Sequence, residues 1–211
     1  MGIGRQTVWA LALAAQVGGA GQEAKGRPAA RETIELLVGV HNYAGVPEAT
    51  VARAEEHAAQ VLDRAGVAVR WVACPVAAGD EEGNRACLAV KDSRGLFLKL
   101  LPEGMARGFR NARAVFGLAI HPNTAYVFAD RVTAGAAHLD LPDHAILGAV
   151  MIHELGHLLL GEGGHVDNGI MSEDLRGKLF RLVAQGSAPR FDSDQVRRIH
   201  ARLAERVRSE R

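Results

Sequence analysis

The sequence has almost no net charge and no long apolar run outside its first residues and one central segment. Its 211 residues contain 25 lysines and arginines against 24 aspartates and glutamates, so the formal net charge is only +1. The two signs are intermixed, which gives no electrostatic case for nucleic acid or an anionic membrane as a partner. Beyond the N-terminus, no segment is long and apolar enough to be expected to cross a membrane.

Cysteine is also scarce. The two cysteines, Cys74 and Cys87, lie on either side of the polar stretch 77–85. In an oxidising compartment, an even pair that closes a short loop indicates a disulfide. Two free, buried cysteines are the alternative, and the spacing is not the C-x-x-C of a redox pair.

The chain begins like a secretory signal. Arg5 gives a short positive region, and the apolar stretch Thr7–Val17 is short for a bilayer span. Small residues then predict cleavage after Ala20. We therefore expect a signal peptide (1–20), a flexible leader (21–32) and export to the periplasm or the medium; an uncleaved anchor is the alternative. The rest, 33–211, fits a single domain with an upper part (33–161) and a lower part (162–211).

Apolar patterning predicts an α+β domain. Strands are expected over 33–40, 67–74, 96–101, 114–120 and 125–132. Helices are expected over 47–65 and 144–160, from Ser172 to about Gln185, and from Asp192 or Ser193 to about Val207. The order suggests a mixed, twisted sheet on two long helices, with a smaller helical C-terminal part. Arginines alternate with glutamates in the last helix, which is typical of a solvated face.

The apolar run Ala145–Leu160 contains an H-E-x-x-H pattern, formed by His153, Glu154 and His157. Histidines four residues apart on a helix lie on one face, so both imidazoles can bind one metal ion. The glutamate between them can activate a water at that ion. A third histidine, His165, follows a glycine-rich turn. Three histidines with no cysteine nearby indicate a hydrolytic zinc site, which leaves one position for water.

The stretch 153–171 resembles the signature of the metzincin zinc metallopeptidases, H-E-x-x-H-x-x-G-x-x-H followed by a methionine-containing turn. It reads H-E-L-G-H-L-L-L-G-E-G-G-H-V-D-N-G-I-M, so the glycine comes one residue late and the third histidine two residues late. The closer likeness is to secreted bacterial metzincin-like proteins with H-E-x-x-H-L-L-L-G-x-x-x-H-x-x-x-G-I-M. The resemblance implies a metzincin-like fold, Zn²⁺ held by His153, His157 and His165, and an apolar floor formed by Met171.

The longer spacing leaves the third ligand open. Glu162 and Asp167 are within chain reach, and a carboxylate is an acceptable zinc ligand. We favour His165, because neutral imidazole suits zinc and its place before the methionine matches the resemblance. Some metzincins add a tyrosine ligand after the methionine turn. Here Tyr43 and Tyr126 both lie upstream, so that ligand is not expected.

In metzincins an edge strand above the zinc pairs with an extended substrate. Gly117, Leu118 and Ala119 resemble that strand, and an ordinary core strand is the alternative. We expect ordinary roles for the remaining histidines. His41 and His121 stand at strand ends, where histidines commonly form hydrogen bonds. For His138 and His144, which lie near the metal helix, support of the ligands is the alternative.

Together these features predict an enzyme, a secreted zinc-dependent metallopeptidase with Glu154 as general base. We expect a monomeric endopeptidase that acts on peptide or protein substrates, without nucleic acid or membrane partners once the signal is removed. A zinc-dependent amidase of cell-wall or small amide substrates is an alternative, because the metal site specifies water activation and not the acyl group. A zinc-bearing binding module without turnover is another, but it would have no need of Glu154.

Overall fold

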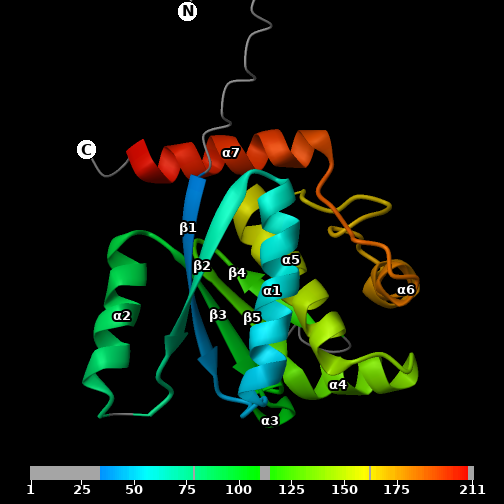
Figure 1. The fold of residues 1–211 in the computed structure, drawn as a ribbon, viewed down its shortest axis with the longest axis horizontal. Coiled ribbons are helices and arrows are strands. Elements are labelled where there is room, and N and C mark those ends of the chain that lie inside the picture. The colour runs from blue at the N-terminus through cyan, green and yellow to red at the C-terminus, as the bar shows by residue number, and fades with distance from the viewer. Residues whose placement is uncertain (1–33, 78, 110–114, 162, 209–211) are drawn as a thin grey trace, which may run out of the picture. The chain divides into compact units, whose positions relative to one another are not determined.

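A five-stranded mixed sheet organises the fold (Figure 1). The structure is a computed structural model that describes residues 34–208, apart from 78, 110–114 and 162. The strands are β1 (Ile34–Asn42), β2 (Val67–Cys74), β3 (Leu96–Leu101), β4 (Gly117–Ile120) and β5 (Thr124–Phe128). Their order across the sheet is β2-β1-β3-β5-β4, with neighbours parallel except for β4, which runs antiparallel to β5 at the edge. A strand is present at each of the five predicted stretches, although β4 and β5 are shorter than predicted.

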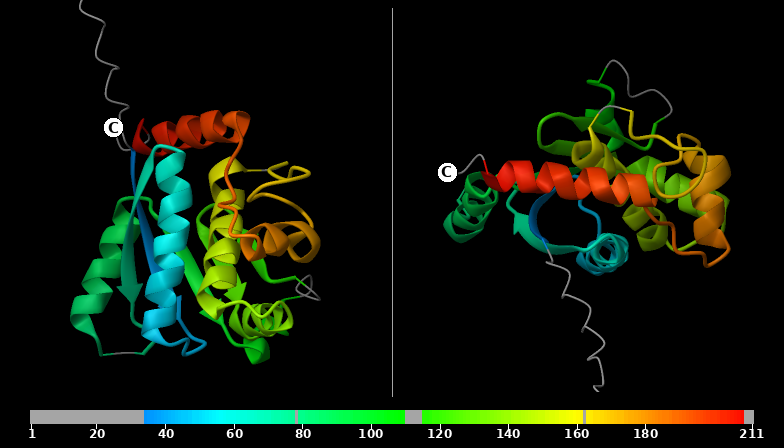
Figure 2. Two further views of the ribbon diagram at one scale, coloured as in Figure 1. Left: turned by 45° about the vertical axis from the view of Figure 1, so that its right-hand side comes forward. Right: turned by 90° about the horizontal axis from the view of Figure 1, so that it is seen from above.

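Helices surround this sheet. They are α1 (Glu48–Arg64), α2 (Glu81–Asp92), α3 (Glu103–Ala106), α4 (Ala129–His138), α5 (Asp143–Leu160), α6 (Phe180–Ala184) and α7 (Ser193–Arg208), with a π-helical turn, η1 (Leu175–Leu179), before α6. α1 and α5 pack side by side, and α7 lies across one end of the sheet (Figure 1 and Figure 2). The predicted α+β class, with two long helices and a helical C-terminal part, is confirmed.

The main core lies between the sheet and the two long helices. Alternate residues of β1, namely Leu36, Val38 and Val40, are at most 4% exposed, because successive side chains of a strand point to opposite faces. α5 is buried on nearly all sides, since it contacts the sheet, α1, α4 and the C-terminal helices. This burial removes most water from the polar side chains that α5 carries.

Three stretches differ from the prediction. The polar stretch 77–85, predicted to be a loop, leads into α2, where the Asp80 side chain accepts a hydrogen bond from the backbone N–H of Gly83 (2.9 Å). The strand predicted over 125–132 ends at Phe128, and α4 begins at the next residue. The helix predicted from Ser172 begins instead after Asp174, whose side chain caps η1.

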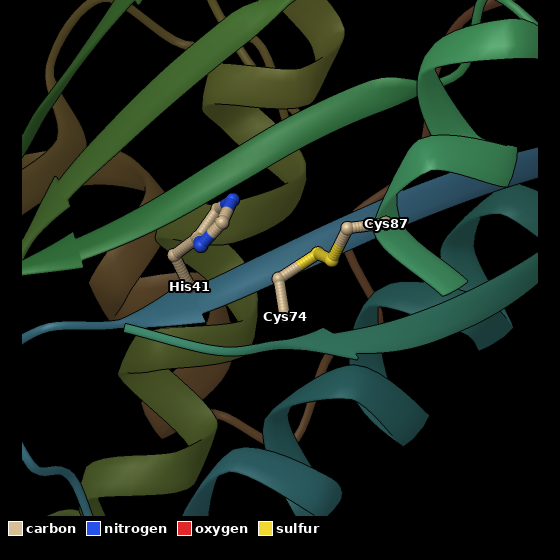
Figure 3. Close-up of side chains that lie close together, drawn as sticks. All are labelled: His41, Cys74 and Cys87. Carbon is tan, nitrogen blue, oxygen red and sulfur yellow. A yellow bond between two sulfur atoms is a disulfide. The ribbon is translucent and has the colours of Figure 1, made fainter. Parts of the chain in front are cut away.

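A disulfide between Cys74 in β2 and Cys87 in α2 confirms the predicted pairing and ties α2 to the sheet. Gly39 makes room for it, since a Cβ there would lie 2.9 Å from the Cys74 Sγ. His41 lies beside the two sulfurs (Figure 3). Because the sulfurs are bonded to each other, they offer no thiolate to a metal ion. His41 instead forms a hydrogen bond through Nδ1 with the carbonyl of Pro75 (3.1 Å).

Within the described part of the chain, no helix combines the length and apolar character needed to cross a bilayer. The predicted signal peptide (1–20) and leader (21–32) lie outside the described residues, so both stay predictions.

Candidate metal centre

Three histidines converge at the C-terminal end of α5. His153 and His157 lie one helical turn apart, and His165 comes from the loop that follows the helix. One ligand nitrogen from each lies within 4.8 Å of the other two. The ring centroids are 4.8 Å apart for His153 and His157, 4.6 Å for His157 and His165, and 5.4 Å for His153 and His165. The structure therefore brings together the three residues that the sequence predicts as ligands.

The orientation and charge of these rings suit zinc. His153 faces the carbonyl of Ile170 with Nδ1 (2.8 Å), so Nδ1 carries the proton and Nε2 keeps its lone pair. That Nε2 lies 3.2 Å from the Nε2 of His157, so both rings aim at one point. Burial lowers the pKa of His153 to about 4 and that of His157 to about 3. Both rings are thus neutral near pH 7, as metal ligands must be.

Of the two alternative third ligands, Glu162 lies outside the described residues. Asp167 is exposed and does not belong to the cluster of ligand atoms around the histidines. Among the described residues, three imidazoles are therefore the set that could hold the ion.

The loop that carries the third histidine is held by α7. Arg198 donates hydrogen bonds to the carbonyls of Leu160 (2.9 Å) and Gly163 (3.3 Å), and the Gln195 side chain donates to the carbonyl of Gly164 (3.1 Å). The alternation of arginines with glutamates predicts a solvated face, but Arg198 contacts the chain instead. These contacts fix the chain between α5 and the third histidine.

Met171 lies against the turn of α5 between the first two histidines. Its side chain is fully buried, and its sulfur occupies the space that a Cβ on Gly156 would need. The backbone N–H of Val166 donates to the carbonyl of Met171 (3.0 Å), which closes the loop on itself. The sulfur packs against α5 at Gly156, and the role of Met171 as an apolar floor under the ion stays a prediction.

Glu154 points from α5 toward the edge strand β4. It is 4% exposed, and a Cβ on Gly117 would lie 2.5 Å from its Cγ and 2.6 Å from its Oε1. Burial raises the pKa of Glu154 to about 8. A cation held by the neighbouring histidines would favour the carboxylate form again.

The free side of β4 faces outward from the sheet. The carbonyl of Phe116 accepts a hydrogen bond from the N–H of Phe128 (2.9 Å). Because main-chain groups alternate in direction along a strand, Gly117 and Ala119 direct theirs away from β5. β4 is thus an edge strand rather than a strand inside the sheet.

A cleft of about 800 Å³ lies over the histidines. One wall is formed by residues 115–119 and His121, the other by residues 173–176 at the start of η1, and the floor by the three histidines, Glu154 and the glycine loop. Two wall residues are not predicted as part of the site: His121 is expected to have an ordinary role at a strand end, and Arg176 is not singled out by the sequence. The position of His121 after the predicted edge strand was the one available signal, whereas nothing local marks Arg176.

Neither His138 nor His144 lines this cleft. The ring of His144 lies 5.5 Å from that of His57, near the opposite end of α5. The alternative that they support the ligands is not favoured by these positions, and the partner of His153 is the carbonyl of Ile170.

No family model matches this sequence, and no curated protein is similar to it in sequence. Among solved structures, the chain is similar to the crystal structure of archaemetzincin from Methanopyrus kandleri. The two chains share 22% identity over 83% of this chain and 99% of the other, with a TM-score of 0.46. What this protein does is therefore inferred from its own side chains.

Proposed function

We propose that this protein is a zinc-dependent peptidase that cuts extended peptides lying along β4. One observation carries the proposal: Glu154 lines the same cleft as the three histidines and also contacts the open edge strand at Gly117. A base, a metal-binding cluster and a surface for a peptide main chain thus meet at one place.

The chemistry follows from the residues of the cleft. Zinc bound by His153, His157 and His165 would supply the Lewis acidity that makes water a nucleophile near pH 7. Glu154 removes a proton from the attacking water and passes it to the nitrogen of the peptide bond. The water oxygen bonds to the carbonyl carbon, the C–N bond breaks, and both water protons end on the leaving amine.

The edge strand favours a peptide substrate. The outward main-chain groups of Gly117 and Ala119 can pair with an extended chain, and such pairing needs no particular side chain. A small amide would leave this edge unused, and a binding module without turnover would have no use for a base beside the metal site. Both alternatives therefore explain less of the cleft than an endopeptidase does.

The test is casein cleavage by the zinc-loaded protein beside Glu154→Gln. We expect the variant to lose about 10³-fold or more in rate, since a general base contributes ~10²–10⁴-fold, while zinc content stays at the wild-type level. Glu173→Gln, which removes an exposed carboxylate from the wall of the same cleft, is the matched control and should stay within a few-fold.

Each of the other outcomes has a definite meaning. Wild-type rates in Glu154→Gln would show that this residue is not the base. If the wild type leaves casein intact but hydrolyses small N-acyl amides, the amidase alternative replaces the peptidase.

A further inference from the structure

One wall of the cleft carries a guanidinium close to the position of the base. Arg176, in η1, lies with its Cζ 5.0 Å from the centre of the Phe116 ring. Phe116 directly precedes Gly117, where Glu154 contacts β4. The positive charge of Arg176 is therefore one residue along the wall from the contact that positions the base.

The aromatic platform beneath this guanidinium is rigid. Phe116 is 4% exposed, and its ring meets that of Phe180 edge to face, with centroids 4.7 Å apart. A Cβ on Gly135 would lie 3.1 Å from the Phe116 ring, so the helix behind it leaves no space for the ring to retreat. A guanidinium stacked on a fixed ring keeps its N–H donors directed outward, and less side-chain entropy is lost when an anion binds.

The Arg176 side chain is exposed and lines the cleft. Among the residues that the structure describes, no ion pair or hydrogen bond joins it to a carboxylate. Asp174 is nearby in the chain, but its side chain accepts the backbone N–H of Gly177 (2.7 Å). Asp174 and Glu173 line both the main cleft and a second hollow of about 380 Å³ beyond His165, whereas Arg176 lines the main cleft and not the second hollow.

We propose that Arg176 is the specificity-determining residue of the cleft, and that preferred substrates carry a carboxylate beside the bond to be cut. A planar guanidinium can bind a carboxylate through two parallel hydrogen bonds, which a lysine cannot do. The carboxylate can belong to an aspartate or glutamate side chain or to the C-terminus of the substrate. This inference rests on the proposed peptidase function for its role in cleavage, but the carboxylate recognition itself does not depend on turnover.

The first experiment compares cleavage of matched fluorogenic peptides, built around a bond that the wild type cuts in casein. One peptide has glutamate next to that bond and the other has glutamine. We expect the wild type to favour glutamate by about 10-fold in kcat/KM, the scale of one charged hydrogen-bonded contact. Arg176→Leu should remove this preference, and Arg176→Glu should reverse it toward a peptide with lysine at that position. Equal preference in the wild type and Arg176→Leu would overturn the proposal.

The second experiment measures binding without cleavage, by calorimetry with the same peptides on the zinc-loaded Glu154→Gln protein. The glutamate peptide should bind about 10-fold more tightly than the glutamine peptide, and the added Arg176→Leu change should abolish the difference. Peptides ending in a free acid or an amide beyond the same bond separate the two sources of the carboxylate. If only the C-terminal acid matters, the protein trims chain ends. Binding selectivity without turnover would keep this inference and refute the peptidase, whereas turnover without selectivity would do the reverse.

Discussion

Replacing Gly117 by alanine should disable the base without removing the metal site. A Cβ at this position would lie 2.5 Å from the Glu154 Cγ, 2.6 Å from its Oε1 and 2.6 Å from the carbonyl oxygen of Tyr126. The carbonyl belongs to the paired backbone of β5 and cannot retreat without disturbing the sheet. Glu154, β4 or both must therefore shift.

The size of the effect follows from this overlap. An extra methyl group in a filled space lowers stability by about 1–3 kcal/mol. Displacing a reacting group by about 1 Å lowers the rate by on the order of 10²-fold, and we expect a loss of this size or larger for Gly117→Ala. The three atoms nearest to this methyl group belong to Glu154 and Tyr126 and none to a histidine, so zinc content should stay unchanged.

The measurement is the casein cleavage rate, with zinc content and urea unfolding determined on the same samples. Gly104→Ala is the matched control, because a Cβ on Gly104 meets nothing within 4 Å, and it should retain wild-type rate and stability. A fully active Gly117→Ala protein would refute the idea that β4 holds the base. Loss of zinc together with activity would show that the substitution collapses the whole site instead.

Two further predictions concern stability. Replacing both Cys74 and Cys87 by serine should lower the free energy of unfolding by about 3 kcal/mol, because the disulfide closes a loop with a sequence separation of 13; urea unfolding that matches the oxidised wild type would contradict this. Burial raises the pKa of Glu55 to about 7 from 4.5, so the folded state holds this proton more tightly than the unfolded state, and stability falls as pH rises between these two values. Glu55→Gln should therefore raise stability by about 1–2 kcal/mol at pH 8 and leave it unchanged at pH 4, whereas the exposed Glu56→Gln should act at neither pH.

The sequence predicts best the parts whose apolar pattern is dense. β2 and β3 have the predicted ends, and α5 begins one residue before its predicted start. α5 is buried along nearly its whole length, β3 alternates buried with half-buried residues, and exposed residues alternate with more buried ones over most of β2. The histidine cluster follows from one of them, since two of its members lie on a single helix. Their spacing fixes them relative to each other before any tertiary contact forms.

Other elements lack a local signal or carry a misleading one. α4 begins with no side-chain cap, directly after the β-branched and aromatic residues of β5, so the strand pattern continues past its true end. α2 is mostly exposed, with Val90 as its fully buried residue, so it has too few apolar positions for a clear helical period. Asp80 followed by two glutamates was the signal for its start.

The walls of the cleft could not be predicted because their residues meet through long-range packing. Phe116 and Arg176 are far apart in the sequence, but in the fold the guanidinium of Arg176 stacks on the ring of Phe116. That ring packs in turn against the ring of Phe180. None of these residues has a spacing that marks it. A motif can therefore locate the chemistry, while the selection of substrates depends on contacts that only the fold creates.

Both margins of the cleft are held by the last helix, α7, near the end of the chain. Besides holding the loop before the third histidine, α7 directs Arg206 to the carbonyl of Pro122 (2.8 Å), next to His121 in the opposite wall. One helix thus forms hydrogen bonds with both margins of the cleft. A cut in the mostly exposed segment 187–190, between α6 and α7, would free both margins from this helix in a single event, so we expect the shape of the cleft to last only as long as that connection stays intact.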